Sequence, residues 1–318
     1  MAPTDRVAGV PDGAEPPLPR VSVGLVVRNA EATVLAAVRS ILFQTLSSWE
    51  LLVANDGSTD RTAKLLEGVR DARVRVTHHA TSRGLAVRLN QLVDSARGAY
   101  FARIDGDDFA FPDRLTRQAC YLDAHRDVDL LGSGMIHFVD GGRSTGKEPV
   151  ETRHEAICRH PRRGFLLYHP TWMGRITWFR RHRYDAGRQR GQDFDLLLRT
   201  YRHSRFAALE EPLLGHRTNN AGLRLRLRSR RNACSALARN AWTQRDPALV
   251  WGIVEQCLKV PVDLLTFATG AHDRVRRRRL RPLEAQDQRA FASAWAVLRQ
   301  WADADRARGS VSRAVADG

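Results

Sequence analysis

The sequence predicts an α/β fold: a mostly parallel, Rossmann-like sheet flanked by helices, with a helical, arginine-rich C-terminal extension. In the first half, apolar runs of six to eight residues alternate with amphipathic segments about a dozen residues long, which is typical of successive βαβ units. Polar turns rich in Asp and Gly follow two of these runs, as expected where strands end at a ligand-binding edge.

The first predicted strand is VSVGLVVR at 21–28, an unbroken apolar run of the kind that is buried on both faces. A helix is predicted over 31–44, because its apolar residues recur three or four positions apart. WELLVAN at 49–55 is the second predicted strand, and it ends at the turn NDGSTD. A short helix is expected after that turn.

The pattern then repeats. VRVTHH at 74–79 is the third predicted strand, and LAVRLNQLVDSA at 85–96 has leucines and a valine on one helical face. Gly98 stops that helix. YFARID at 100–105 is the fourth predicted strand, and the acidic stretch GDD follows it directly.

The second half is more irregular. Between about 128 and 182, VDLLGSG, MIHFVD and FLLYHP are candidate strands, and QDFDLLLRTYRH at 192–203 is predicted to be helical. Beyond about residue 218 the sequence is helical, with the arginine runs LRLRLRSRR at 223–231 and RVRRRRLR at 274–281.

The charge balance is strongly basic, with 51 Lys and Arg residues against 35 Asp and Glu residues and a net charge of +16. This excess predicts a polyanionic partner or surface, such as nucleic acid, anionic lipid or a nucleotide-diphosphate substrate. An arginine-rich proteome with GC-biased codons explains much of the same excess equally well. The four cysteines show no CxxC spacing, which disfavours a zinc site or a disulfide framework and suits a reducing cytoplasm.

No membrane-spanning segment is predicted. Residues 1–19 are rich in proline and lack an apolar core, so they are interpreted as a disordered leader and not as a signal peptide. The most apolar stretch, which starts at Trp251, is interrupted by Glu255, Lys259 and Asp263.

One candidate phosphate-binding loop can be dismissed. GGRSTGKE at 141–148 has the glycine and lysine spacing of a P-loop, but Glu148 stands where a Ser or Thr must hold magnesium. Because the segment follows a candidate strand that ends at Asp140, a hairpin turning at the two glycines is the better interpretation.

The acidic turns are the strongest candidate site. Asp56 ends the second predicted strand and Asp105 ends the fourth, so both are expected at the carboxyl edge of one parallel sheet, where open α/β sheets bind ligands. Asp105 and Asp107 have the D-x-D spacing of carboxylates that share a divalent cation with phosphate oxygens. The alternatives are an ordinary Asx-Gly turn at Asp56 and a solvated acidic loop at Asp105.

The order of these segments resembles family 2 of the inverting glycosyltransferases, which have the GT-A fold. The resemblance spans about residues 20 to 220 and covers the C-terminal third poorly. It rests on VSVGLVVRNAEATVLAAVRSILFQT, ELLVANDGSTD, SRGLAVRLNQLVDSARGAYFARIDGDDFAFPDRL, YHPTWMGR (168–175) and GQDFDLLLR (191–199).

The resemblance implies an enzyme that moves a sugar from a nucleotide-diphosphate sugar, with UDP favoured, to a hydroxyl of a glycan or lipid-linked acceptor, as in cell-envelope polysaccharide synthesis. The implied domain organisation is a GT-A domain at 20–220, followed by a helical basic region at 221–318. Within the GT-A domain, a nucleotide-binding half covers about 20–110 and an acceptor half about 111–220.

The resemblance also implies roles for residues of the nucleotide-binding half. Asp56 corresponds to an acid that contacts the nucleotide base, with Asn55 beside it in place of a second acid. Asp107 would be the principal ligand of Mg²⁺ or Mn²⁺, and Asp105 would lie between the ribose and the metal. Arg83 and Gly84 match positions that approach the nucleotide, although Arg83 as a salt-bridged surface residue fits equally well.

In the acceptor half, the family's catalytic base falls on Asp193, which follows Gln192 at the start of a predicted helix. A carboxylate in the first turn of a helix is also stabilised by the helix dipole alone, which is the alternative for Asp193. His169 is expected to line the acceptor pocket or to be structural, and Arg217 matches a family arginine that follows a strand. Asp195 is expected to brace the helix end.

Two rival functions remain at this stage, a metal-dependent nucleotidyltransferase and a basic nucleic-acid-binding protein. The first usually carries a glycine- and lysine-rich loop after its first strand, which VVRNAEAT lacks. The arginine runs have no interleaved aromatic residues, which disfavours the second. The runs are expected instead to contact anionic lipid, so that the protein lies at the inner face of the cell membrane.

Overall fold

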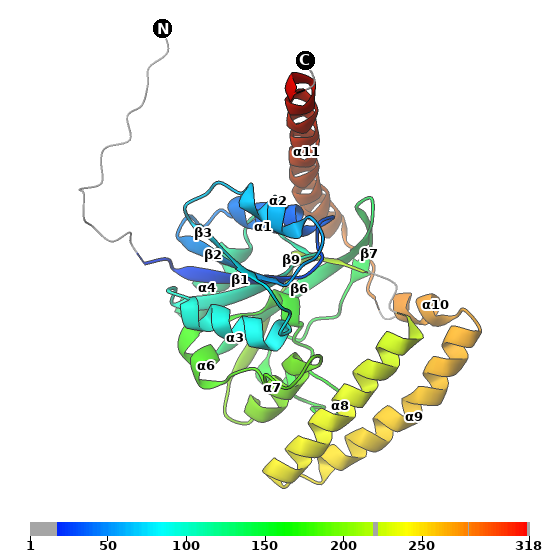
Figure 1. The fold of residues 1–318 in the computed structure, drawn as a ribbon. Helices are drawn as coiled ribbons and strands as arrows, with labels where there is room; N and C mark the ends of the chain where they lie inside the picture. Colours follow the sequence, from blue (N-terminus) through cyan, green and yellow to red (C-terminus); the bar gives the residue numbers. More distant parts are fainter. Residues whose placement is uncertain (1–17, 219–221, 279, 317–318) are drawn as a thin grey trace.

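The computed structural model describes residues 18–218, 222–278 and 280–316 (Figure 1). The predicted disordered leader at 1–19 lies outside these residues, apart from its last two positions. The strands are β1 (Val21–Val27), β2 (Trp49–Asp56), β3 (Val74–His79), β4 (Tyr100–Asp105), β5 (Phe109–Ala110), β6 (Leu130–Val139), β7 (Arg143–Lys147), β8 (Met173–Arg175) and β9 (Phe206–Arg217).

The helices follow the predicted alternation with the strands in the first half and dominate after β9. They are α1 (Val34–Leu42), α2 (Thr62–Glu67), α3 (Leu85–Ser95), α4 (Arg114–Ala124), α5 (His154–Ile157), the 3₁₀ turn η1 (His169–Thr171), α6 (Ile176–Arg181), α7 (Gln192–Thr200), α8 (Leu223–Gln244), α9 (Ala248–Ala268), α10 (His272–Arg277) and α11 (Ala285–Ala316).

The strands form one sheet in the order β3-β2-β1-β4-β8-β6-β9-β5, with β7 added beside β6. The first four predicted strands are parallel to one another, so β1, β2 and β4 end at the same edge. Beyond β4 the sheet is mixed, because β8 pairs antiparallel with both β4 and β6 while β6 and β9 are parallel. The predicted α/β class, with its helical C-terminal region, is confirmed.

The central strands are buried on both faces, and their side chains alternate between two core layers. Figure 1 shows α1 and α2 on one side of the sheet and α3, α6 and α7 on the other. In β4, Tyr100, Ala102 and Ile104 belong to the layer with α1, whereas Phe101 packs in the layer with α7. Arg103 and Asp105 therefore share the α7 side of β4, which decides what they face.

The structure corrects three local expectations. The helix predicted over 31–44 begins only at Val34, and the residues before it form a loop. VDLLGSG and MIHFVD belong to the single strand β6, and FLLYHP is no strand, because it runs as an irregular segment into the 3₁₀ turn η1. The hairpin at Gly141 and Gly142 is confirmed: both glycines have positive φ, and β7 pairs antiparallel with β6.

The C-terminal helices pack on the α/β domain at two places. Helix α8 contacts α7 through an apolar cluster of Leu198, Ala236, Leu237 and Leu249, and it lies beside α9 in a hairpin (Figure 1). Helix α11 returns to the sheet, where Phe291 packs against Phe109 and Phe138. None of the described helices is both long enough and apolar enough to cross a membrane.

Candidate active site

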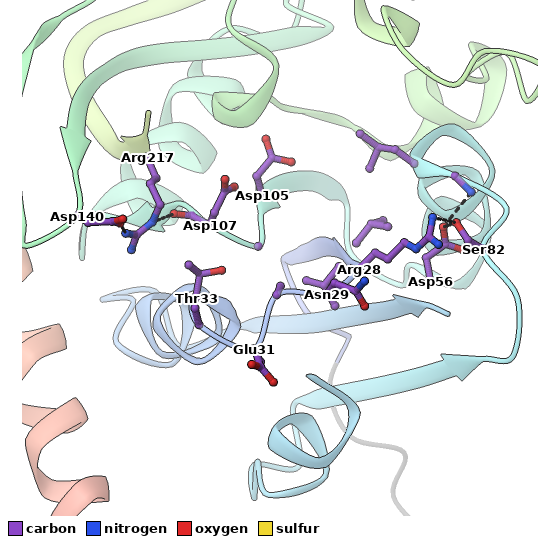
Figure 2. Close-up of a pocket in the computed structure, with 17 residues that line it drawn as sticks. Arg28, Asn29, Glu31, Thr33, Asp56, Ser82, Asp105, Asp107, Asp140 and Arg217 are labelled. Carbon is purple, nitrogen blue, oxygen red and sulfur yellow. Dashed lines mark hydrogen bonds and ion pairs between the residues drawn. The ribbon is translucent and has the colours of Figure 1, made fainter. Parts of the chain in front are cut away.

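A cleft of about 800 Å³ opens at the carboxyl ends of β1, β2 and β4 (Figure 2). It lies at the edge where the sequence predicts a ligand site. Polar side chains enter it from the ends of β2 and β4, from the loop before α1, from the loop before α3 and from the ends of β6 and β9. These residues are Arg28, Asn29, Glu31, Thr33, Asp56, Ser82, Asp105, Asp107, Asp140 and Arg217.

The loop before α1 forms one wall of the cleft, and a tight turn fixes its shape. Asn29 has a φ of 50°, which asparagine tolerates better than most residues. Its side-chain oxygen accepts a 2.8 Å hydrogen bond from the backbone N–H of Thr59, and its own N–H donates to Ser58 Oγ at 3.0 Å. The turn after β2 therefore holds this wall in place.

Asp56 lies at the base of the cleft and is almost fully buried. Its carboxylate accepts hydrogen bonds from Arg88 Nε at 2.6 Å, Ser82 Oγ at 2.7 Å and the backbone N–H groups of Arg83 and Gly84 at 2.9 Å. Burial alone would raise the pKa of this carboxyl, but the four hydrogen bonds outweigh it and lower the pKa to about 2. Asp56 therefore holds the loop before α3 in place through these hydrogen bonds.

We expect Asp56→Asn to lower the free energy of unfolding by roughly 3–5 kcal/mol at pH 7, because it leaves the buried Arg88 guanidinium without its counter-charge. Urea denaturation measures the change. The control is Asp94→Asn, which removes an exposed ion pair with Arg183 and should cost less than about 1 kcal/mol. Equal losses in the two variants would contradict the structural role of Asp56.

The lowered pKa of Asp56 should also make the stability of the protein depend on pH. Its pKa is about 2 in the folded protein against an ordinary value of 3.8, so its stabilisation is complete above about pH 4 and is lost as the pH falls towards 2. The stability gap between the wild type and Asp56→Asn should therefore narrow over that interval.

Two predicted site residues near Asp56, Asn55 and Arg83, do not line the cleft. The Asn55 amide donates to His78 Nδ1 at 3.1 Å and its oxygen accepts from the N–H of Ser58, so this buried side chain is occupied within the turn. Gly57 has a φ of +69°, and a Cβ there would lie 2.8 Å from the Ser82 nitrogen. Gly84 lines the cleft, whereas the Arg83 side chain is exposed and does not line it.

Asp105 and Asp107 both line the cleft at the end of β4 (Figure 2). Asp105 forms an ion pair with Arg103, which is buried on the same side of the strand. Burial, together with the nearby negative charges of Asp108 and Asp105, raises the pKa of Asp107 to about 6. Crowded carboxylates of this kind are stabilised by a cation.

Behind this pair, Asp108 organises the end of β9. It is fully buried, and it lies 3.0 Å from His216 Nδ1 and 2.9 Å from the backbone N–H of Arg217, which donates to it. The Asp108 carboxylate outweighs burial and raises the pKa of His216 to about 9. The Arg217 side chain donates to the carbonyl of Asp107 at 3.2 Å and pairs with Asp140, which brings Arg217 into the cleft as Figure 2 shows.

The oxygen donors at the end of β4 fit a hard divalent cation. Among the described residues, no group of three or more His, Cys, Asp or Glu side chains converges closely enough to hold a metal by itself. Two carboxylates beside an open cleft match the way Mg²⁺ is bound, with one or two protein carboxylates and with phosphate oxygens and waters completing the shell.

Asp193 lies in the first turn of α7, on the side of the sheet that Arg103 and Asp105 face. Burial raises the pKa of the Asp193 carboxyl, Arg103 opposes this rise and Asp105 adds to it. Two predicted site residues that are 88 positions apart in the chain, Asp105 and Asp193, are therefore close enough for the charge of one to act on the other. Gln192 beside Asp193 is buried, and its Oε1 has no hydrogen-bond partner among the described residues.

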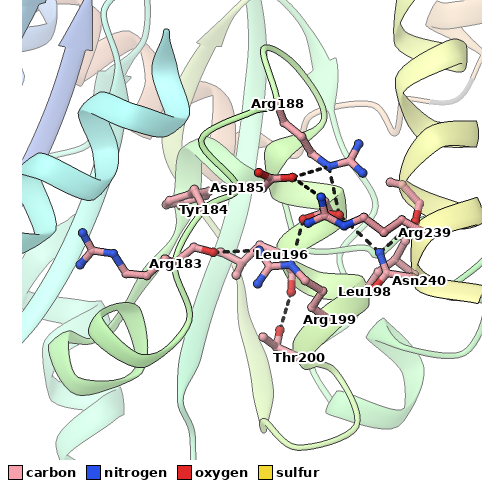
Figure 3. Close-up of polar contacts among 12 residues, drawn as sticks. Arg183, Tyr184, Asp185, Arg188, Leu196, Leu198, Arg199, Thr200, Arg239 and Asn240 are labelled. Carbon is pink, nitrogen blue, oxygen red and sulfur yellow. Dashed lines mark hydrogen bonds and ion pairs between the residues drawn. The ribbon is translucent and has the colours of Figure 1, made fainter. Parts of the chain in front are cut away.

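Asp195 braces the start of α7, as the sequence predicts. Its fully buried carboxylate lies 3.1 Å from Arg188 Nε and 2.9 Å from Arg199 Nε, and Asn240 of α8 donates to it at 3.3 Å. Figure 3 shows Arg188, Arg199 and Asn240 converging from three segments. The orientation of α7, and hence of Asp193, is fixed by this cluster.

His169 is buried in the core and is not among the residues that line the cleft. Its Nε2 is 2.9 Å from the hydroxyl of Tyr184, and its ring packs edge-on against Trp172. Burial, helped by the positive charge of Arg103, holds the pKa of His169 well below its ordinary value, so the imidazole is neutral. Of its two predicted roles, this placement favours the structural one.

Sequence reasoning missed the buried arginines of the site. Arg103 pairs with Asp105, Arg88 pairs with Asp56, and Arg114 donates to the carbonyl oxygens of Arg103 and Pro170. The available signal for Arg103 was its i, i+2 relation to Asp105 on a strand, which places both on one face. Arg88 and Arg114 lie in helices, and nothing in their local pattern marks them as buried.

The site can be compared with known proteins. A sequence profile described as Glycosyl transferase family 2 matches residues 22–190, which is more than half of the chain. The chain is 33% identical over 189 residues to EpsE of Bacillus subtilis, which is named as a glycosyltransferase; the match covers 58% of this chain and 67% of EpsE. It is 30% identical over 208 residues to the O-antigen biosynthesis glycosyltransferase WbnJ of Escherichia coli, covering 64% and 81% of the two chains.

Solved structures show the same fold at lower identity. A TarS fragment from S. aureus in complex with UDP-GlcNAc matches with a TM-score of 0.56 and 16% identity, covering 88% of this chain and 80% of the fragment. The mannosyltransferase PcManGT of Pyrobaculum calidifontis, in complex with GDP-Man and Mn²⁺, matches with a TM-score of 0.56 and 16% identity, covering 89% and 88%. A longer TarS structure is covered over only 39% of its length.

Proposed function

Because the chain belongs to glycosyltransferase family 2, we propose that it transfers a sugar, with inversion, from a UDP-sugar to a hydroxyl of a glycan or lipid-linked acceptor of the cell envelope. The observation that carries the proposal is that Asp105 and Asp107 line one cleft at the end of β4, while the charge of Asp105 also acts on the buried carboxyl of Asp193 at the start of α7. The rival functions of nucleotidyltransferase and nucleic-acid-binding protein are disfavoured, since members of this family are sugar transferases.

The donor is proposed to lie in the cleft at the carboxyl ends of β1, β2 and β4. The Asp56 carboxylate is hydrogen-bonded to protein groups, so we propose that it acts on the nucleotide indirectly, by shaping the loop at Ser82 and Gly84. Asn55 is proposed to support this loop from the turn after β2, and Arg83 to approach the nucleotide from the exposed side of the loop. Arg217 is proposed to contact the diphosphate, because a guanidinium matches phosphate oxygens in geometry and charge.

The proposed chemical step is a single displacement. The acceptor hydroxyl attacks the anomeric carbon, the bond from that carbon to the diphosphate oxygen breaks, and the hydroxyl proton moves to a carboxylate oxygen of Asp193. The raised pKa of Asp193 makes it a better proton acceptor than an exposed aspartate, while Arg103 favours its ionised form.

Asp107, with Asp105, would hold the divalent ion together with oxygens of the diphosphate. When bound, Mg²⁺ or Mn²⁺ supplies Lewis-acid stabilisation of the departing diphosphate. Arg103 is proposed to hold Asp105 in position through their ion pair, so that only one of its oxygens stays turned to the cleft.

A thermal-shift screen of nucleotide sugars tests the donor assignment. We expect a stabilisation that requires both Mn²⁺ or Mg²⁺ and one UDP-sugar, because the ion and the diphosphate complete each other's site. Stabilisation by UDP-sugars that is unchanged by EDTA would contradict the metal assignment, and a response to GDP-sugars alone would contradict the choice of nucleotide.

A second pocket supports a phosphate-bearing acceptor. It has a volume of about 420 Å³, lies between the segment before α7 and helix α8, and is lined by five arginines and one acid, Asp185. The side chains of Arg190 and Arg231 make no hydrogen bond or ion pair with any described residue, and both residues are exposed. Unpaired guanidinium groups beside the helix that carries Asp193 would suit the diphosphate of a lipid-linked acceptor. The remaining arginines are Arg188, Arg228 and Arg239.

We expect Arg231→Ala to weaken the binding of a short prenyl diphosphate roughly tenfold, because it removes charge-assisted hydrogen bonds to phosphate. Calorimetry in the presence of Mn²⁺ and saturating UDP, which together fill the donor cleft, measures the affinity. Arg224→Ala is the matched control, since Arg224 is an exposed arginine of the same helix outside the pocket. Equal effects of the two substitutions would mean that only the overall positive charge matters.

A further inference from the structure

Helix α9 has an exposed face made entirely of apolar residues. Soluble helices normally turn such a face towards the core and leave charged residues outside. Here the side chain of Leu258 is 68% exposed and that of Leu265 is 65% exposed. The exposed residues of α9 are Ala248, Val250, Trp251, Val254, Cys257, Leu258, Pro261, Val262, Leu264, Leu265 and Ala268.

The polar residues of α9 point inward instead. Glu255 is held by Arg162 at 2.9 Å and by Arg163 at 2.8 Å. Asp263 is buried and forms ion pairs with Arg226 and Arg230 of α8. The acids of this helix are thus neutralised against the protein, and its outward face carries no negative charge.

Two exposed tryptophans lie at the turn between α8 and α9. Trp242 near the end of α8 is 86% exposed, and Trp251 in the first turn of α9 is 67% exposed. Tryptophan has an apolar body and one polar N–H, and it is enriched where hydrocarbon meets lipid headgroups. The turn therefore extends the apolar face with the residue type that suits a membrane interface.

The surroundings of this face are strongly basic. Residues 222–282 contain fourteen arginines and lysines against four aspartates and glutamates. At the far end of α9, Arg274 and Arg278 are exposed, and the run RVRRRRLR continues there. An apolar stripe beside clustered arginines matches the surface of an anionic bilayer, where a hydrocarbon core lies beneath negatively charged headgroups.

We propose that the exposed face of α9, the α9 face, is seated in the headgroup layer of an anionic lipid bilayer, with α9 lying in the plane of the membrane. The partner is lipid and not a second copy of this chain, because two copies joined through the α9 face would bring two strongly basic segments together. The sequence predicts the lipid contact at the arginine runs 223–231 and 274–281, whereas this proposal places the inserted surface on α9. The arginines then supply attraction to the headgroups, and the apolar face supplies the insertion.

Vesicle flotation of the full chain tests the proposal. Wild-type protein should float with vesicles of phosphatidylcholine and phosphatidylglycerol and bind pure phosphatidylcholine at least about tenfold more weakly, since the basic charge is attracted only to the first. Leu258→Glu combined with Leu265→Glu should lower the partition coefficient for the anionic vesicles by about tenfold or more, because two leucines that would insert into the lipid are replaced by charged side chains.

The control places one new charge elsewhere. Leu166→Glu substitutes a partly exposed leucine outside the α9 face and should leave flotation unchanged. Because Leu258 and Leu265 are exposed, their substitution should leave the melting temperature unchanged, and wild-type tryptophan fluorescence should be quenched by brominated lipid.

Three results would overturn the proposal: no flotation of the wild type, equal flotation of the double variant, or a lipid-free dimer that the double variant converts to a monomer. The last would identify the α9 face as an interface between copies. None of these depends on sugar transfer, so failure here is separable from failure of the proposed function.

Discussion

Replacing Asp193 by asparagine is expected to abolish sugar transfer, lowering kcat by roughly 10²- to 10⁴-fold, the range that general-base catalysis contributes. The substitution keeps the shape of the side chain but removes the group that accepts the acceptor proton. UDP-sugar binding should stay within about twofold of wild type, because Asp193 is not among the residues that line the donor cleft. Steady-state transfer kinetics and a donor-binding titration measure the two effects.

The neighbouring aspartate separates catalysis from folding. Asp195→Asn removes a buried charge that pairs with Arg188 and Arg199, so it should lower the melting temperature, whereas Asp193→Asn should not. Turnover near the wild-type rate in Asp193→Asn would show that another group is the base.

The titration of Asp193 should also be visible in the pH dependence of kcat/KM. Because the pKa of Asp193 is raised and its carboxylate is the active form, kcat/KM should fall on the acidic side, with a midpoint above that of an ordinary aspartate. The fall should persist at saturating metal, which separates it from protonation of Asp107.

Replacing Asp107 by asparagine is expected to lower transfer by a factor of about 10² or more and to remove the stabilisation by Mn²⁺, since the amide is a much weaker ligand for a hard cation. The raised pKa of Asp107 reflects uncompensated negative charge beside Asp105 and Asp108, so the substitution should not destabilise the metal-free protein. Transfer assays and thermal shifts with and without Mn²⁺ measure these outcomes.

The same acidic stretch supplies a matched control for Asp107. Asp113 is exposed at the start of α4, away from the cleft, and Asp113→Asn should change neither transfer nor the response to Mn²⁺. If Asp107→Asn kept its Mn²⁺-dependent stabilisation, the principal metal ligand would have to be another residue.

The edge of the sheet could be predicted because it follows from local pattern and general topology. The runs at β1, β2 and β4 are apolar on both faces, which indicates parallel strands, and parallel strands end at one edge. The placement of Asp56, Asp105 and Asp107 at one site could therefore be predicted from this shared edge alone. The turn at Gly57 and the hairpin at Gly141 were predictable for the same reason, since turn residues act within a few positions of themselves.

The roles within the cleft were less predictable. The contact of Asp56 with a nucleotide base stays a prediction, and no local pattern indicated that its carboxylate also accepts hydrogen bonds from the loop before α3. The arginines that pair with the site acids come from a strand face and from a helix, and their burial depends on helices placed later in the chain.

The sequence by itself determined the α/β class, the carboxyl edge of the sheet and its acids, because residues close in sequence carry that information through strand period and turn chemistry. Only the tertiary structure decided that the charges of Arg103 and Asp105 act on Asp193 of α7, and that the apolar residues of α9 lie outside while its acids lie inside. The physical reason is the same in both cases. An amphipathic pattern shows that two faces differ, but which face becomes the interior depends on what the rest of the chain packs against it.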